Sequence, residues 1–191
     1  MTQVRNVAVV VGSIRKDSVS RKLAKAFAAL NPNLKFNVIE IADLPHFDQD
    51  LESDPPAQWV RFRNEIAAAD AVLFVTPEYN RSVPGVLKNA IDVGSRPYGQ
   101  SVWNGKPGAV ISLSPGAIGG FGANHHLRQS LVFLNVPLLS QEAYVGNAFA
   151  LFDESGELVN EGTGEFLKAY GAQFAAWIEK IVDEAPAAKA A

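Results

Sequence analysis

The sequence predicts an α/β protein in three layers, with helices on both faces of a five-stranded parallel sheet. Two observations predict it. Short apolar runs alternate along the chain with segments that carry apolar residues at helical spacing, which is the strand–helix repeat of a parallel sheet. Three of the runs are continuous rather than alternating, which is typical of strands buried on both faces.

Five apolar runs are the candidate strands. They lie at 7–12, 36–41, 71–76, 108–113 and 136–140. The first, third and fourth are rich in β-branched residues, which favour strands. The fifth run, VPLLS, is the weakest of the five.

Four segments between or after these strands carry apolar residues on one helical face. The predicted inward residues are Leu23, Phe27 and Leu30; Trp59, Phe62 and Ile66; Leu87, Ile91 and Gly94; and Leu127, Leu131 and Leu134. A fifth helix is predicted over 164–183, and its inward residues are Phe166, Tyr170, Phe174, Trp177 and Ile181. Residues 1–184 are expected to form one domain, followed by a frayed tail over 185–191.

The strand count also predicts the topology. Five strands fit the flavodoxin-like order 2-1-3-4-5 better than the six strands of a full dinucleotide-binding fold. Right-handed crossovers then place helices on both faces. In such a sheet, ligands bind beyond the carboxyl ends of the strands where the strand order reverses. The loops at 12–20, 76–84 and 113–122 should therefore form the site.

The composition excludes several classes of function. The 191 residues include no cysteine, which removes disulfides, thiolate nucleophiles and cysteine-ligated metals. The net charge of −3 gives no reason to expect nucleic acid or an anionic membrane as a partner. No apolar run reaches the roughly 18 residues of a membrane helix, and the start MTQVRNVAVVVG lacks the features of a signal peptide. A cytoplasmic location is expected.

The first loop, GSIRKDSVS, is predicted to bind a single phosphate. Serine hydroxyls and the first N–H groups of a helix can donate to phosphate, and a guanidinium grips it through paired donors. The residues assigned to this site are Ser13, Arg15, Ser18, Val19 and Ser20. The loop lacks the Gly-Lys-Ser/Thr ending of a P-loop and the three glycines of a dinucleotide loop. The alternative is a serine-capped helix whose basic residues face water.

The second and third loops are predicted to hold a flat ring. In Thr76–Asp92, Tyr79 offers a flat surface and Asn80 offers hydrogen bonds, although Tyr79 could instead pack on the core. The third loop has four glycines between Gly116 and Gly122, which would let a planar ligand approach the backbone or merely form a linker. A phosphate and a large flat heterocycle together describe a mononucleotide, and FMN fits best.

The three stretches GSIRKDSVSRKLA, TPEYNRSVPGVLKNAID and SPGAIGGFGANHHLRQ resemble the NADPH-dependent FMN reductase family, which includes bacterial quinone, azo-dye and chromate reductases. The resemblance covers about residues 4–177. It assigns Ser13, Arg15, Ser18 and Ser20 to the FMN phosphate, although many relatives carry Asn at the position of Ser20. It places Pro77, Glu78, Tyr79 and Asn80 along the flavin ring, largely through backbone groups, and Ser114 and Gly116 on its other side. It does not fix the role of Arg81, which could bind a phosphate of NADPH or contact a neighbouring subunit.

The resemblance also implies a reaction. NADPH or NADH would pass hydride to flavin N5, and the reduced flavin would then reduce a quinone, azo, chromate or free-flavin acceptor in a ping-pong sequence. No side chain is assigned to catalysis and no metal is assigned, because the acids Asp48, Asp50 and Glu52 lack the spacing of a calcium loop. His46 is expected to edge the pocket or the surface. His125 and His126 are either proton donors or a polar helix start at a subunit contact.

The family further implies a homodimer or a dimer of dimers. Phe121 and Trp103 are candidate interface residues, and Arg128 and Glu142 are candidate inter-subunit partners. The main rival function is a flavodoxin-like electron carrier without its own NAD(P)H site, against which the weak net charge argues. A response-regulator receiver would need acidic residues after the first strand, and a low-molecular-weight phosphatase would need a cysteine.

Overall fold

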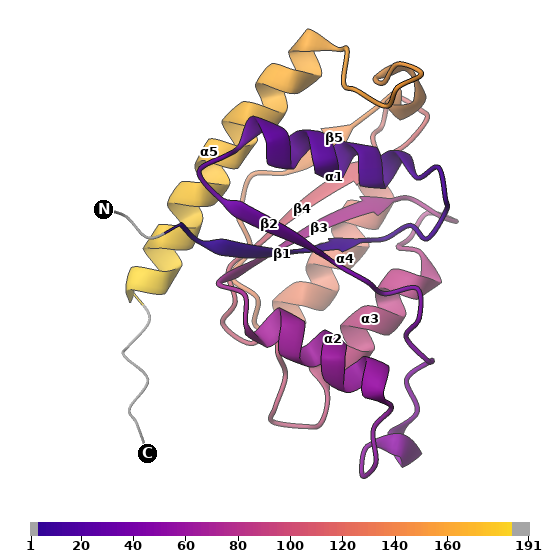
Figure 1. The fold of residues 1–191 in the computed structure, drawn as a ribbon, viewed down its shortest axis with the longest axis vertical. Coiled ribbons are helices and arrows are strands. Elements are labelled where there is room, and N and C mark those ends of the chain that lie inside the picture. Colours follow the sequence, from indigo (N-terminus) through magenta and orange to yellow (C-terminus); the bar gives the residue numbers. More distant parts are fainter. Residues whose placement is uncertain (1–3, 185–191) are drawn as a thin grey trace.

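The structure, a computed structural model, describes residues 4–184 and contains one parallel sheet with helices on both faces (Figure 1). The strands are β1 (Asn6–Val11), β2 (Lys35–Ile39), β3 (Ala71–Pro77), β4 (Gly108–Leu113) and β5 (Ala143–Val145). They lie in the order β2-β1-β3-β4-β5, and every neighbouring pair is parallel. The predicted fold class and strand order are confirmed. The tail expected to fray lies outside the described residues.

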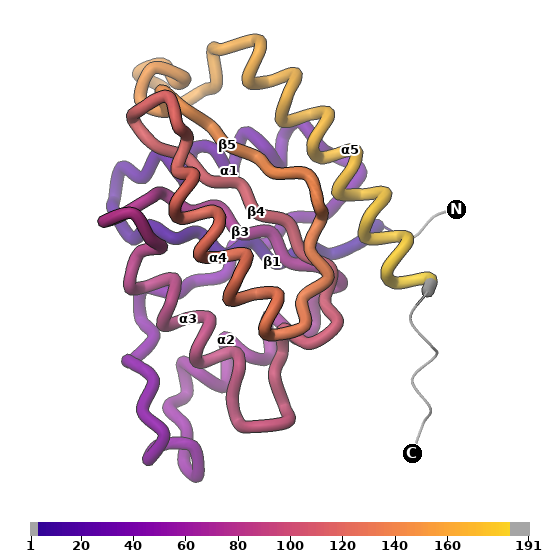
Figure 2. The backbone as a smooth tube through the Cα atoms, turned by 180° about the vertical axis from the view of Figure 1, so that it is seen from behind, coloured from indigo at the N-terminus to yellow at the C-terminus, as the bar shows by residue number. Residues whose placement is uncertain are grey.

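The helices form the outer two layers. They are α1 (Val19–Leu30), α2 (Ala57–Ala67), α3 (Gly85–Ser95), α4 (Phe121–Phe133) and α5 (Glu161–Glu184). Residues of α1 and α5 pack in one apolar cluster against the sheet, and residues of α2, α3 and α4 pack in a second. Figure 2, seen from behind, shows the face that α3 and α4 cover. Short 3-10 turns, η1 (Gln49–Leu51) and η2 (Ala148–Ala150), follow β2 and β5.

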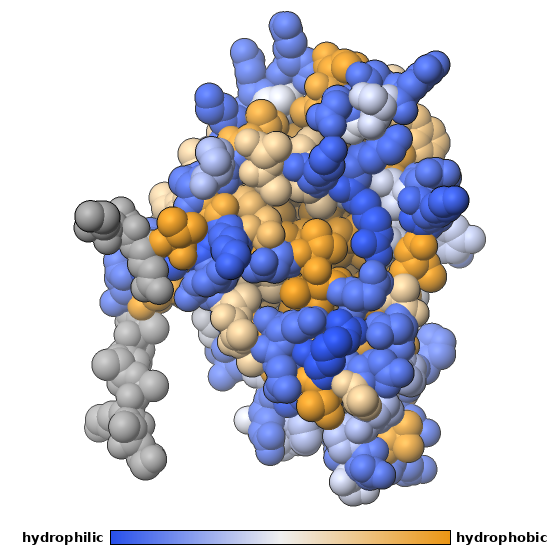
Figure 3. Space-filling model, in the orientation of Figure 1, coloured by the Kyte–Doolittle hydropathy of each residue, from blue (hydrophilic) through white to orange (hydrophobic). Residues whose placement is uncertain are grey.

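The continuous apolar runs serve both clusters. Val7, Val9 and Val11 of β1 belong to the α1–α5 cluster, whereas Ala8 and Val10 belong to the cluster on the other face. Successive residues of a strand point to opposite faces, so a strand covered by helices on both sides is apolar throughout. The edge strand β2 differs, because only its last residue is buried. Figure 3 shows apolar side chains in the opening between α1 and α2, over this edge strand.

The fifth strand was predicted at the wrong place. Residues 136–140 make a single bridge, Leu138 with Gly108, and the ladder resumes only at Ala143. Pro137 has no N–H to donate to a ladder. The Arg128 side chain also donates to the carbonyl oxygens of Leu139 and Gln141, at 3.0 and 2.8 Å. Those carbonyls are therefore bound to a side chain of α4, and pairing with β4 is delayed to β5.

The inward face of α5 also differs from the prediction. The fully buried stripe is Leu167, Tyr170, Phe174 and Ile178, so only Tyr170 and Phe174 were assigned correctly. Phe166 and Trp177 lie partly buried at the flank of the cluster, and Ile181 belongs to neither cluster. Trp177 needs a partner for its indole N–H and donates it to the carbonyl of Pro137 at 2.8 Å. The predicted inward residues of the other four helices are buried in or packed against the two clusters.

Trp103 is a core residue rather than an interface residue. It is fully buried and donates its indole N–H to the carbonyl of Ile91 at 2.9 Å. Its ring fills the space beside Gly94, where an added Cβ would lie 2.5 Å from the indole. The prediction that Trp103 contacts a second subunit is therefore wrong.

No helix within residues 4–184 combines the length and the apolar character needed to cross a membrane.

Candidate active site

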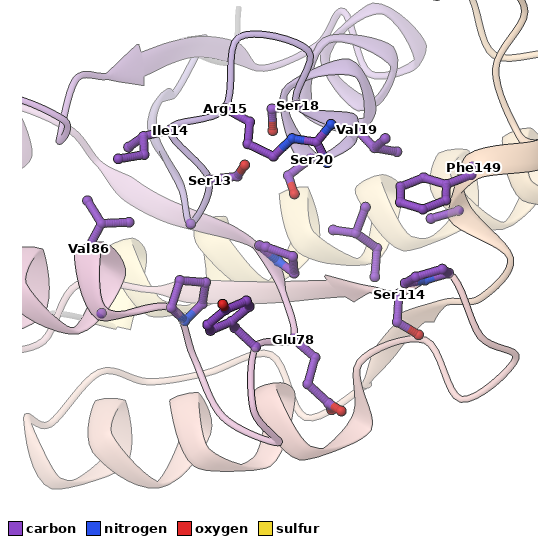
Figure 4. A pocket seen from close by; sticks show the side chains of 18 residues that line it. Ser13, Ile14, Arg15, Ser18, Val19, Ser20, Glu78, Val86, Ser114 and Phe149 are labelled. Carbon is purple, nitrogen blue, oxygen red and sulfur yellow. The ribbon is translucent and has the colours of Figure 1, made fainter.

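A cavity of about 650 Å³ opens at the carboxyl ends of the strands. This volume lies within the range of small-molecule sites, roughly 300–1,000 Å³. Its walls come from loops that follow β1, β3, β4 and β5 (Figure 4). Nine of the predicted site residues line it: Ser13, Arg15, Ser18, Val19, Ser20, Pro77, Glu78, Tyr79 and Ser114. Asn80 and Gly116 do not.

The start of α1 supplies the donors at one end of the cavity. Ser18 is the N-cap, and its hydroxyl oxygen accepts from the N–H of Arg21 at 3.2 Å, which leaves the hydroxyl proton free to donate elsewhere. The N–H groups of Val19 and Ser20 belong to the first helical turn, where no helical carbonyl is available to them. Both serines of this turn, Ser18 and Ser20, are almost fully buried.

Charge at the cavity wall is sparse. Among the residues that line it, only Arg15 and Glu78 are charged. Arg15 is exposed and extends over the cavity in Figure 4. Because the Glu78 carboxylate is engaged elsewhere, as described below, the first loop presents positive charge and N–H donors together. That combination suits a single phosphate.

Gly12 brings the first loop close to β3. Its N–H donates to the carbonyl of Val75 at 2.9 Å, which extends the β1–β3 ladder by one bond. An added Cβ at this glycine would lie 2.8 Å from Thr76 Oγ1 and 3.1 Å from Leu87. The missing side chain therefore lets the loop leave the sheet directly beside the end of β3.

The second loop is a tight hairpin. Tyr79 and Ser82 exchange two backbone hydrogen bonds of 2.9 and 3.0 Å. Asn80 and Arg81 between them have φ values of 49° and 61°, which is the left-handed geometry of a two-residue type I′ turn. Tyr79 is 68% exposed on the cavity wall, so the alternative that it packs on the core is wrong. Asn80 lies at the exposed tip, which explains why it does not line the cavity.

Glu78 joins this hairpin to α4. Its Oε2 accepts from the N–H groups of Gly122 and Ala123 at 2.8 and 3.3 Å, and its Oε1 accepts from Arg81 at 3.3 Å. The N-cap position of α4 is Gly120, which has no side chain to satisfy these donors. In Figure 4 the carboxylate points toward α4 and away from the first loop. The Glu78 side chain therefore caps a helix.

The third loop folds back onto the segment after β5. The carbonyl of Gly116 accepts from the Ser114 hydroxyl at 3.0 Å and from the Asn147 N–H at 3.2 Å, and Ala148 N–H donates to the carbonyl of Ser114 at 3.0 Å. An added Cβ at Gly146 would lie 2.6 Å from the carbonyl oxygen of Ala117. These contacts turn Gly116 away from the cavity and bring Ala148 to its wall.

Nine lining residues were missed by the sequence analysis: Gly12, Ile14, Pro84, Gly85, Val86, Leu113, Pro115, Ala148 and Phe149. Most of them lie in or beside the three predicted loops and add apolar surface. Phe149 had no signal of its own, because it follows β5, which was predicted seven residues too early. Phe149 is 63% exposed.

Neither histidine of α4 lines the cavity. His125 Nε2 lies 3.0 Å from the Tyr144 hydroxyl, which donates to Glu142, and His126 Nδ1 lies 3.0 Å from the Ser82 hydroxyl. Burial and the hydrogen bond to Glu142 raise the pKa of Tyr144 to about 12, so the phenol keeps its proton at neutral pH. His125 is thus bound to β5 and His126 to the second loop, both outside the cavity.

The remaining sequence candidates lie apart from the cavity. Arg128 donates to Asn124 at 2.9 Å and to the two carbonyls before β5, so its guanidinium is engaged within its own chain. His46 is exposed and does not line the cavity. Within residues 4–184, no group of three or more His, Asp or Glu side chains is arranged to hold a metal ion.

The residues present fit an FMN-shaped ligand. One end of the cavity offers Arg15 and the start of α1 for a phosphate, and the other offers Tyr79, prolines and aliphatic side chains for a flat ring. The walls are mostly apolar, which excludes water from a ring between them.

Comparisons with known proteins agree with this geometry. Residues 5–150 match the family described as NADPH-dependent FMN reductase. A quinone reductase of Pseudomonas putida is 61% identical over 182 residues, which are 94% of this chain and 97% of that protein. A 2-hydroxy-1,4-benzoquinone reductase of a Burkholderia species is 48% identical over 174 residues, 90% of this chain and 95% of that protein.

Solved structures are similar as well. The flavoenzyme FerB of Paracoccus denitrificans, an NAD(P)H:(acceptor) oxidoreductase, superimposes with a TM-score of 0.87 at 45% identity, covering 93% of this chain and 98% of that one. An FMN-dependent NADH-azoreductase of Bacillus anthracis in complex with FMN superimposes with a TM-score of 0.63 at 15% identity, covering 91% of this chain and all of that one. The second likeness concerns the fold alone.

Proposed function

Because the chain belongs to the NADPH-dependent FMN reductase family, as its resemblance predicted, we propose that it oxidises NAD(P)H and reduces quinone-type acceptors with bound FMN. The observation that carries this proposal is the cavity, which combines a loop whose donors suit a phosphate with mostly apolar walls. The family makes the chain an oxidoreductase with FMN as its cofactor, and the proposal adds the acceptor and the order of steps.

The chain's own residues bind and orient the cofactor, which supplies the redox chemistry. FMN held in this cavity would supply two-electron chemistry between NAD(P)H and an acceptor. Ser13, Arg15 and the first turn of α1 would hold the phosphate. Tyr79, from the loop after β3, and Ser114, from the loop after β4, would flank the ring. The proton that a quinone takes up besides the hydride would come from solvent in this scheme, since no histidine among the described residues lines the cavity.

A shared binding cavity supports a ping-pong sequence. If the nicotinamide and the acceptor both stack on the ring in this cavity, they would have to use its exposed side in turn. The nicotinamide product would leave before the acceptor enters. Lines of double-reciprocal plots at several fixed acceptor concentrations would then be parallel.

Quinones are the favoured acceptors among the quinone, azo, chromate and free-flavin classes. Two of the similar proteins are named as reductases of quinones. The aromatic and aliphatic side chains Tyr79, Val86 and Phe149 give the cavity an apolar rim that suits a flat, uncharged ring better than the chromate dianion. We expect kcat/KM to be higher for a benzoquinone than for chromate.

Anaerobic stopped-flow absorbance tests this function. Purified protein should be yellow, and acid should release FMN rather than FAD. Mixing the holoenzyme with NADPH, or separately with NADH, should bleach the flavin rapidly, and a later pulse of benzoquinone should restore the colour. A flavin that stays oxidised with both nucleotides would reject the reductase and favour the flavodoxin-like carrier.

We also propose a homodimer or a dimer of dimers. The half-exposed Phe121 beside the third loop is available for such a contact, whereas Trp103 is buried and Arg128 is bound within its own chain. Sedimentation velocity at micromolar concentration should give two or four times the chain mass of 20.5 kDa. A single species at 20.5 kDa would reject the oligomer but would leave the redox proposal unaffected.

A further inference from the structure

Glu78 is the acidic residue among those that line the cavity. Both of its carboxylate oxygens accept hydrogen bonds from other groups of the protein. Oε2 accepts from two N–H groups at the start of α4, and Oε1 pairs with Arg81. Its side chain is only 14% exposed. The carboxylate therefore ties the second loop to the third loop at the point where α4 begins.

The space around this contact is closed. An added Cβ at Gly122 would lie 3.0 Å from Glu78 Oε2 and 2.8 Å from the carbonyl oxygen of Arg81. Glycine at position 122 therefore lets the hairpin approach the helix end closely enough for the hydrogen bond. The hairpin itself is fixed by the two bonds between Tyr79 and Ser82, so a shift of the carboxylate would shift Tyr79 with it.

The position of the carboxylate also matters electrostatically, because it lies at the N-terminus of α4. The start of a helix carries a partial positive charge that would favour negative charge on a nearby ligand. At α4 this positive end is already neutralised by Glu78 rather than directed at the cavity. A fixed negative charge next to a flavin ring makes the addition of electrons to that ring less favourable.

We propose that Glu78 is a positioning residue with two separable effects on the cofactor. Its hydrogen bonds hold Tyr79 and the third loop in place for the ring, and its charge lowers the reduction potential of bound FMN. The inference rests on the proposed function, because it needs FMN in this cavity.

Two substitutions separate the effects. Glu78→Gln keeps an oxygen that can accept from the N–H of Gly122 but removes the charge. Glu78→Ala removes both the acceptor and the charge. Glu65→Gln is the matched control, because Glu65 also pairs with an arginine, Arg61 at 2.9 Å, but does not line the cavity.

Two measurements distinguish the positioning effect from the charge effect. The first is the dissociation constant of FMN from the apoprotein, by fluorescence titration. The second is the midpoint potential of bound FMN, by dye-equilibrated anaerobic titration. We expect Glu78→Gln to bind FMN within about threefold of the parent protein and to shift its potential upward. Glu78→Ala should weaken FMN binding by roughly 3- to 30-fold, the range for loss of a helix cap.

The outcomes decide the inference. An unchanged or lowered potential in Glu78→Gln would overturn the electrostatic part, and an unchanged FMN affinity in Glu78→Ala would overturn the positioning part. If Glu65→Gln raised the midpoint potential by the same amount, the shift would come from net charge rather than from the place of Glu78. That result would also overturn the electrostatic part. If the parent protein binds no FMN, the proposed function fails instead, which the same titration shows before any variant is compared.

Discussion

Arg15 is the only cation among the described residues that line the cavity, and a phosphate there would exchange water for a charge-assisted hydrogen bond. Replacing Arg15 by Ala should therefore cost about 1.5–3 kcal/mol of FMN binding, which is roughly 10- to 100-fold in affinity. Fluorescence titration of the apoprotein with FMN measures the loss.

Lys16 provides the control for this prediction, since it is the next residue in the same loop, is exposed and does not line the cavity. Lys16→Ala should leave the FMN dissociation constant within about twofold, as expected of an exposed charge away from the ligand. Equal losses in both variants would mean that the loop attracts phosphate by its general charge, and the assignment to Arg15 would fail.

The sequence predicted the residues of the first loop better than those of the other two. Residues such as Ser13 and Arg15 follow a buried strand and precede a helix, so sequence order alone places them at the ligand end of the sheet. Glu78 shows the limit, because its side chain could point into the cavity or away from it. That choice is decided by the N–H groups of Gly122 and Ala123 in the first turn of α4, which come from a distant part of the chain.

At the scale of elements, the packing of α1 against α5 makes a prediction of stability. Gly171 lies on the inner face of α5, where an added Cβ would come within 1.9 Å of the Asn31 side chain at the end of α1. Asn31 is buried and donates to the carbonyl of Phe27 at 2.8 Å, so it has little room to move. Gly171→Ala should destabilise the protein by about 1–3 kcal/mol, the cost of overpacking a core. Urea unfolding followed by circular dichroism measures it.

Gly164 in the same helix should respond in the opposite direction. An added Cβ there meets only Leu158, at an ordinary contact distance of 3.8 Å. Alanine costs less backbone entropy than glycine in a helix, so Gly164→Ala should be neutral or stabilise by up to about 1 kcal/mol. If both alanines destabilise equally, the Asn31 contact is not what distinguishes the two sites.

Element prediction failed where a distant side chain decided the outcome. The VPLLS run is apolar enough for a strand, but Arg128 from α4 binds the carbonyl of Leu139 within it and that of Gln141 just after it, and β5 forms later at a less apolar segment. No pattern within 136–140 contains that information. The face of α5 was misassigned for a related reason, since Phe166 and Leu167 are both apolar and only packing against α1 and β4 selects between them.

At the scale of the whole molecule, the described residues predict a loss of stability in acid. Hydrogen bonds hold the pKa of three glutamates below their ordinary value of 4.5: the bond from Ala42 N–H for Glu40, from Arg96 for Glu52 and from Arg5 for Glu179. A carboxylate with a depressed pKa in the folded state stabilises that state above its unfolded pKa. This stabilisation is lost as the pH falls through the folded pKa. The urea midpoint should therefore fall as the pH is lowered from about 5.

Glu179 allows a specific test of that trend. It accepts two hydrogen bonds from Arg5, at 3.0 and 2.9 Å, and so joins the residue before β1 to the end of α5. Glu179→Gln should unfold at lower urea than the parent protein at pH 7. Because Arg5 lowers the pKa of Glu179, the two midpoints should converge only as the pH falls through that lowered pKa. A gap that does not narrow at all as the pH is lowered would show that the pair acts by shape rather than by charge.

The cavity occupies only one edge of the sheet, and the opposite edge, where the strands begin, carries none of its walls. Lys35 is exposed there, at the first residue of β2. Since the chain has no thiol of its own, a single cysteine introduced in place of Lys35 would be a unique attachment point. The protein could then be tethered to an electrode, or labelled with a dye, with the opening of the cavity facing solution.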